Sequence, residues 1–186
     1  MDREVVLTRE PGGSPTAEQI RAVLLDPRSS DIDATTQALL FAAARRDHLN
    51  ATILPALARG AVVICDRFID STRAYQGAGG LDPAVIRTLE GIAIGTRLPD
   101  LTVILDVPVE IGMTRAAARH GDSLASSDRF ERQTVAFHAS VRAHFTAIAE
   151  REPQRCRLID ASGTPDATFA ALLAAVVPRL GQGSAR

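Results

Sequence analysis

The sequence predicts an α/β protein built on a doubly wound parallel sheet, and two observations support that prediction. Short apolar runs rich in Val, Ile and Leu, typical of strands buried on both faces, occur at residues 5–8, 61–65, 101–107 and 157–160. Longer segments with helical spacing lie between them, and strands that alternate with helices form parallel sheets. Because no repeat or linker interrupts the 186 residues, one domain over 1–186 is expected.

The expected helices begin and end at residues that favour helix boundaries. Ser14 can cap a first helix that opens with Pro15, and Asp26-Pro27 ends it. The longest helical pattern covers 33–59, where Pro55 should produce a kink near the last turn. Further helices are expected from about residue 70 and over 82–94, 108–119, 128–150 and 165–180, with a loop at 120–127.

Composition and charge exclude several classes of protein. The net charge is −1 with 23% charged residues, so no bulk polycation for nucleic acid is present. All 21 basic residues are Arg, and without Lys no catalytic step can use an amine side chain. No signal peptide and no apolar run of membrane-spanning length is visible, which favours a cytoplasmic protein that binds no membrane.

The cysteines and histidines give no sign of a metal centre or a disulfide framework. Cys65 and Cys156 lie in or beside strand-like runs, as small core residues of a reducing compartment do. The four histidines lack metal-ligand spacing, and we interpret all of them as surface residues of helices: His48, His120, His138 and His144.

The run at 61–65 ends abruptly in Asp66 and Arg67. Ligands of open α/β sheets bind at the carboxyl ends of parallel strands. A carboxylate there can bind a metal ion or accept a proton, and a guanidinium can make two parallel hydrogen bonds to a phosphate. The alternative is a solvated Asp–Arg pair at a strand end.

Three further motifs allow a functional and a structural interpretation. Residues 9–13, Arg-Glu-Pro-Gly-Gly, could approach an anion with their backbone or form a simple tight turn. Phe41 and Arg45 share a helix face, where the ring of Phe41 could stack on a base and Arg45 could bond the edge of that base. The alternative is that Phe41 belongs to the hydrophobic core and Arg45 lies at the rim of that core. Tyr75 before Gln76 could border a sugar or be half buried.

Arginines bracket the Gly- and Ser-rich loop at 120–127. On a lid they could close over transferring phosphates and neutralise their charge. The alternative is a solvated helical hairpin. The residues concerned are Arg115, Arg119, Arg129 and Arg132.

Taken together, these motifs resemble bacterial thymidylate kinase over nearly the whole chain. The matching segments are 8–13, 39–45, 66–67 with Ser71 and 75–77, 99–102, 105–107 and 128–131. The resemblance implies a P-loop kinase-type sheet with flanking helices. It also implies transfer of the ATP γ-phosphoryl group to dTMP, giving dTDP for dTTP synthesis, with Mg²⁺ as cofactor and a homodimer as the assembly.

The resemblance assigns the nucleoside to five residues. Phe41 would stack on thymine, and Arg45 would bond the edge of that base. Ser71, Tyr75 and Gln76 would line the nucleoside, with Tyr75 crowding a ribose 2′-hydroxyl.

It assigns the phosphate chemistry to another five. Arg67 would hold the acceptor phosphate, and Asp66 would order Mg²⁺, directly or through water. Arg9 would contribute to substrate binding. Arg119 and Arg129 would belong to a lid at about 119–129.

The sequence departs from the family pattern in two places. Gly77-Ala78-Gly79-Gly80-Leu81 lacks the Arg that the family carries there. The family also begins with a strand, a phosphate loop ending Gly-Lys-Ser/Thr and a helix, and a chain without Lys holds no such loop. The expectation is that this unit is missing, leaving two unpaired strand edges between 61–65 and 101–107 and the chain inactive by itself.

Two rivals to a dTMP kinase follow. One is an inactive truncated homologue that only binds nucleotide or a partner, which upstream sequence would distinguish. The other is a related kinase with a different acceptor, which a substrate panel would distinguish.

Overall fold

The computed structural model describes residues 3–26, 28, 32–120 and 130–180, and these form two compact units. One unit contains residues 1–98 with 128–133, and the other contains 99–127 with 134–186. Each is described by itself. Within the described ranges, no helix combines the length and the apolarity needed to cross a bilayer.

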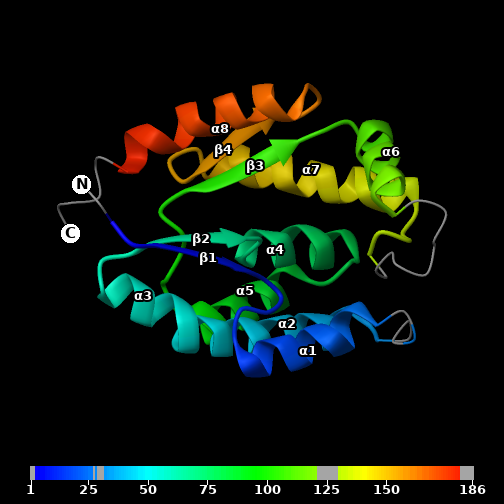
Figure 1. The fold of residues 1–186 in the computed structure, drawn as a ribbon. Coiled ribbons are helices and arrows are strands. Elements are labelled where there is room, and N and C mark those ends of the chain that lie inside the picture. Colours follow the sequence, from blue (N-terminus) through cyan, green and yellow to red (C-terminus); the bar gives the residue numbers. More distant parts are fainter. Residues whose placement is uncertain (1–2, 27, 29–31, 121–129, 181–186) are drawn as a thin grey trace. The chain divides into compact units, whose positions relative to one another are not determined.

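The first unit is organised on two parallel strands, β1 (Val5–Arg9) and β2 (Val62–Asp66). Their register places Arg9 beside Asp66, and the backbone N–H of Glu10 donates to the carbonyl of Asp66 at 2.9 Å. The last residues of both strands therefore lie together at the carboxyl edge. Figure 1 shows α1 (Pro15–Leu25) lying against α2 (Ala34–His48) in this unit.

The long helical pattern at 33–59 is divided by a π turn. Asp33 caps α2 by accepting from the backbone of Thr35 and Thr36. The π turn η2 (Leu49–Ile53) follows, and then α3 (Leu54–Ala58). The N–H of Leu54 bonds to the carbonyl of Leu49, five residues back. The irregularity expected at Pro55 thus begins before the proline, as a widened turn of a kind frequent at functional sites.

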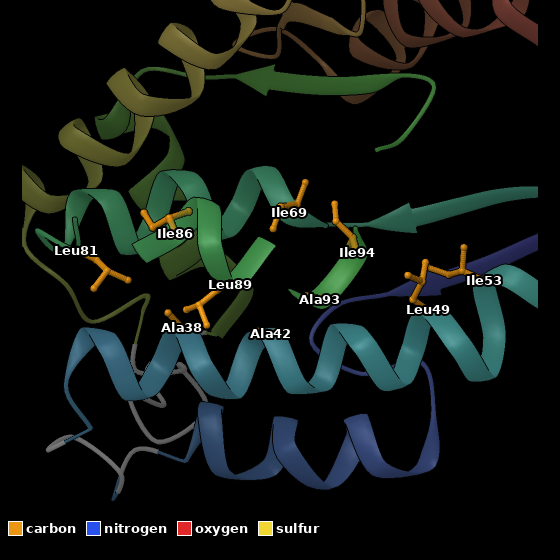
Figure 2. Close-up of a cluster of buried hydrophobic side chains, with 10 residues drawn as sticks. All are labelled: Ala38, Ala42, Leu49, Ile53, Ile69, Leu81, Ile86, Leu89, Ala93 and Ile94. Carbon is orange, nitrogen blue, oxygen red and sulfur yellow. The ribbon is translucent and has the colours of Figure 1, made fainter. Parts of the chain in front are cut away.

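A buried apolar cluster joins the helices of the first unit. Figure 2 shows its side chains in the space between α2 with η2 and the helices α4 (Ile69–Ala78) and α5 (Pro83–Ile94). This packing fixes α4, which follows the end of β2, against α2. The cluster consists of Ala38, Ala42, Leu49, Ile53, Ile69, Leu81, Ile86, Leu89, Ala93 and Ile94.

The second unit also has two parallel strands, β3 (Thr102–Asp106) and β4 (Cys156–Asp160). Its helices are α6 (Val109–His120), α7 (Val135–Arg151) and α8 (Pro165–Leu180). α7 contacts both strands and α8 contacts β4. The helix expected from residue 128 begins only at 135, because Thr134 is its N-cap and accepts from the N–H of Phe137.

The predicted α/β fold with parallel strands is confirmed for the residues that the structure describes. Their strands form two two-stranded sheets, and no ladder joins β2 to β3, which agrees with the expected unpaired strand edges between 61–65 and 101–107. The expectation of strands buried on both faces is wrong, since Leu7 is 75% and Ile64 53% exposed. These two are register partners, so their side chains share a face that the described helices leave open. The missing unit and the single domain stay predictions.

Candidate functional site

The carboxyl end of β2 presents Asp66 and Arg67, both exposed. Arg67 has φ 65°, the only positive φ among the described non-glycine residues. Such strained residues cluster at ligand sites. The Cys65 thiol donates to the carbonyl of Arg67 at 3.0 Å. Burial, with a smaller contribution from Glu10, raises the pKa of Cys65 to about 12, so the thiol keeps the proton it donates.

Aromatic rings gather next to Arg67 in the first unit. Its guanidinium carbon lies 5.2 Å from the ring centre of Tyr75. The ring of Phe130 lies 5.8 Å from Tyr75 and 6.0 Å from Phe41, centre to centre. All three rings are partly exposed. Phe130 belongs to the motif at 128–131, which the sequence predicted to be helical. Its contacts with the rings of Phe41 and Tyr75 were not predicted.

The first unit also contains a buried polar network. Arg45, 2% exposed, donates from Nε to Glu10 Oε2 at 2.7 Å and from Nη1 to Thr72 Oγ1 at 3.1 Å. His48, fully buried, has Nδ1 3.1 Å from Glu10 Oε1 and Nε2 2.7 Å from Thr8 Oγ1. The network contains an acid, two bases and two hydroxyls from β1, α2, α4 and the loop after β1.

Two sequence interpretations are wrong at this point. His48 is not a surface residue, because Glu10 and Thr8 provide polar partners for both ring nitrogens and allow its burial. Arg45 is not on the rim of the core, because a buried carboxylate compensates its charge. Its guanidinium carbon also lies 5.3 Å from the ring centre of Phe68. Phe41, the core ring of that same alternative, is partly exposed.

The loop after β1 uses its glycines to approach the protein's own side chains. A Cβ on Gly13, where φ is 83°, would lie 2.5 Å from Thr8 Oγ1 and would overlap the ring of His48. Thr52 donates to the carbonyl of Gly13 at 2.6 Å. Ser14 is the N-cap residue of α1 as expected, but its hydroxyl makes no cap hydrogen bond and donates to Asp47 instead, at 2.6 Å. The loop is therefore fixed to α2 and η2.

Arg9, predicted to bind substrate, pairs with a carboxylate of α1 in this structure. Its Nη2 lies 3.2 Å from Glu18 Oε1 in a pair whose side chains are 55% and 43% exposed. Glu18 also accepts from the N–H of Gly13, and this bond, more than Arg9, holds the pKa of Glu18 below its usual range.

The other predicted site residues are placed as follows. Ser71 is partly buried in the first turn of α4. Gln76 is 2% exposed and donates to Gln37 at 3.5 Å. Arg119 belongs to α6, but its side chain is not among those that the structure describes. Arg129 is not among the described residues. Arg115 donates to the carbonyls of Ala161, Ser162 and Gly163 in the second unit, at 2.6–2.9 Å.

The exposed carboxylate at the end of β2, that of Asp66, suits Mg²⁺ bound to substrate phosphates. Among the residues that are described, no three metal-ligating side chains gather. Mg²⁺ bridging substrate phosphates keeps several waters and needs only one or two carboxylates. Asp66, exposed beside Arg67, fits such an ion.

Comparisons with known proteins agree on one family. The family model described as thymidylate kinase matches residues 1–171. A thymidylate kinase of Caulobacter vibrioides is 52% identical over 179 residues, covering 96% of this chain and 84% of that protein. One of Geotalea uraniireducens is 49% identical over 181 residues, covering 96% and 85%. The crystal structure of thymidylate kinase from Ehrlichia chaffeensis superposes with a TM-score of 0.71 at 33% identity, covering 93% and 80%.

Proposed function

The chain belongs to the thymidylate kinase family, and we propose that it binds dTMP as acceptor of the ATP γ-phosphoryl group and forms dTDP. The observation that carries this proposal is the row of partly exposed rings that begins with Tyr75 beside Arg67 and continues through Phe130 to Phe41, with Arg45 one helical turn from Phe41. Rings suit a flat base, and a guanidinium suits a phosphate. The resemblance of the sequence motifs to thymidylate kinase predicted the same substrate.

Arg45 supports a base with an acceptor on its edge. Nε and Nη1 of its guanidinium each have a partner, whereas Nη2 has none among the described residues. A buried N–H without an acceptor is costly. The C4 carbonyl of thymine, stacked on Phe41, would supply the acceptor.

Arg67 and Asp66 support the phosphate end. Arg67 would fork the dTMP phosphate, and the ring of Tyr75 beneath it would face the deoxyribose. Asp66 would hold Mg²⁺, which would neutralise phosphate charge during transfer. Ser71, Gln76 and Arg9 remain proposed substrate neighbours, and Arg119 and Arg129 remain proposed lid residues. A cytoplasmic homodimer completes the proposal.

The direct test is a nucleotide panel on the 186-residue chain. Calorimetric titration should rank dTMP above dCMP, which lacks the carbonyl at C4, and above thymidine, which lacks the phosphate. Formation of dTDP from ATP is followed in the same samples with Mg²⁺ and with EDTA. Equal affinity for dCMP and dTMP would contradict the proposal. Because the phosphate-loop unit is expected to be missing, dTDP formation is also followed in a chain to which that unit has been added. Selective dTMP binding without any dTDP in that extended chain would favour the nucleotide-binding homologue.

A further inference from the structure

We infer that His48 is a positioning residue for base recognition, which acts on Arg45 through the carboxylate of Glu10. The inference rests on the proposed function. His48 contacts one oxygen of Glu10 and Arg45 contacts the other, at 3.1 and 2.7 Å. The carboxylate is thus held from both sides, and its plane sets the plane of the guanidinium.

The chemistry of the network fixes the direction of each hydrogen bond. A carboxylate facing a guanidinium is an acceptor at both oxygens. The imidazole must therefore donate from Nδ1 to Glu10. In the neutral imidazole Nε2 then accepts, and the Thr8 hydroxyl donates to it over 2.7 Å. The chain runs Thr8 to His48 to Glu10, with Arg45 donating from the other side.

The backbone around His48 is shaped to admit its ring. Gly13 has φ 83°, and any side chain there would overlap the imidazole. The π turn starts at the residue after His48 and brings Thr52 to the carbonyl of Gly13. The ring is therefore fixed by two segments that contact no proposed ligand, as a support for the site requires.

Loss of the Nδ1 donor frees the carboxylate. The last torsion of a glutamate is broad, so only its partners define the carboxylate plane. Arg45 Nε would follow Glu10, and the guanidinium edge facing the base would lose its fixed direction. The expected consequence is a loss of discrimination between bases, since the phosphate contact at Arg67 is made by a different segment.

The test compares two substitutions that keep different halves of the imidazole. In His48→Asn the amide nitrogen takes the place of Nδ1 and can still donate to Glu10. In His48→Gln the amide takes the place of Nε2 and reaches only Thr8. The readout is the ratio of the dCMP and dTMP dissociation constants, measured by calorimetry on the full chain, with His144→Asn and His144→Gln as controls on α7.

His48→Gln should lower the ratio at least about fivefold, the worth of one hydrogen bond. His48→Asn should keep it within about twofold, and both His144 variants should match wild type. A ratio unchanged in His48→Gln, or lowered equally in both His48 variants, overturns the inference while the wild-type preference for dTMP leaves the proposed function standing. Wild-type protein without that preference overturns both.

A second variant covers the case in which His48 substitutions prevent folding, as judged by circular dichroism. Thr8→Val keeps the side-chain shape and removes only the donor to Nε2. A folded Thr8→Val protein with a ratio lowered about twofold or more supports the inference. A ratio equal to that of wild type contradicts it.

Discussion

The two arginines proposed to bind dTMP have opposite surroundings. Arg45 is buried, and its charge is met by Glu10 in a pair whose side chains are each 3% exposed. Arg67 is exposed, at a strained backbone position and against the ring of Tyr75. The difference indicates that the arginine proposed to read the base is oriented before ligand arrives, whereas the arginine proposed to bind the phosphate stays in contact with water. Substitutions at the buried end should therefore affect folding, and those at the exposed end should affect chemistry.

The largest effect is expected for Glu10→Gln, measured as the free energy of unfolding in urea. Removing one charge leaves the buried Arg45 uncompensated, which costs about 3–5 kcal/mol. Glu18→Gln is the matched control, because Glu18 pairs with an arginine at the surface. That variant should lose at most about 1 kcal/mol. If both variants lose the same free energy of unfolding, burial of the ion pair does not determine how much the pair contributes to stability.

In an enzyme completed with the missing phosphate-loop unit, Arg67→Lys should lower kcat/KM for dTMP about 100-fold, with the affinity of the 186-residue chain for dTMP as a second readout. Lysine keeps the charge but loses the bidentate fork that places the phosphate. The free energy of unfolding should remain within about 0.5 kcal/mol, since the side chain is exposed. Arg87→Lys on α5 is the control. Near-normal activity of Arg67→Lys would restore the interpretation of Asp66 and Arg67 as a solvated pair.

Tyr75→Ala should reduce the preference for dTMP over its ribonucleotide. A 2′-hydroxyl buried against the ring without a partner costs about 1–3 kcal/mol, or roughly 5- to 150-fold in binding. The measurement is the ratio of the two kcat/KM values in an enzyme completed with the missing unit, or the ratio of the two dissociation constants in the 186-residue chain. Tyr75→Phe keeps the ring and should keep the ratio. If Tyr75→Ala weakens both nucleotides equally, the tyrosine only packs.

The smallest effect is expected for an exposed pair in the second unit. Arg142 donates to both oxygens of Asp106 at 2.7 Å and thereby lowers the pKa of that carboxyl below its ordinary value of 3.8. The stabilisation is therefore complete above about pH 4 and is lost as pH falls through the lowered pKa. With Arg142 43% exposed, Asp106→Asn should cost at most about 1 kcal/mol at pH 7. Urea unfolding at pH 7 and pH 3 tests this. A loss of unfolding free energy above about 1 kcal/mol at pH 7 would contradict the expectation that an exposed ion pair contributes little.

The sequence predicted the elements wherever local chemistry marks their ends. α5 runs from Pro83 to Ile94 as expected, and β2 delivers Asp66 to the edge of its sheet. It also placed Phe41 and Arg45 on one face of α2 from their spacing alone. Those predictions rest on residues close in sequence, where helical and strand periods act directly.

The buried network could not be predicted in the same way, because its members are distant in sequence. Glu10 and Arg45 are separated by 35 positions, and only the fold brings them together. One signal was available, since His48 follows Arg45 by three residues and Phe41 by seven, on the same helical face. The π turn has no sequence signal of comparable strength.

The π turn makes chain length in this segment a determinant of the site. A regular α-helix advances about 100° per residue, and a π turn accommodates one extra residue within a helix. Deleting one residue from Leu49–Ile53 would permit a regular helix from Ala34 to Ala58. It would also rotate α2 by about 100° relative to α3 and carry the ring of His48 away from Thr8. A single-residue deletion here should therefore be tolerated less well than most side-chain replacements, although every hydrogen-bonding group of the network would remain in the sequence.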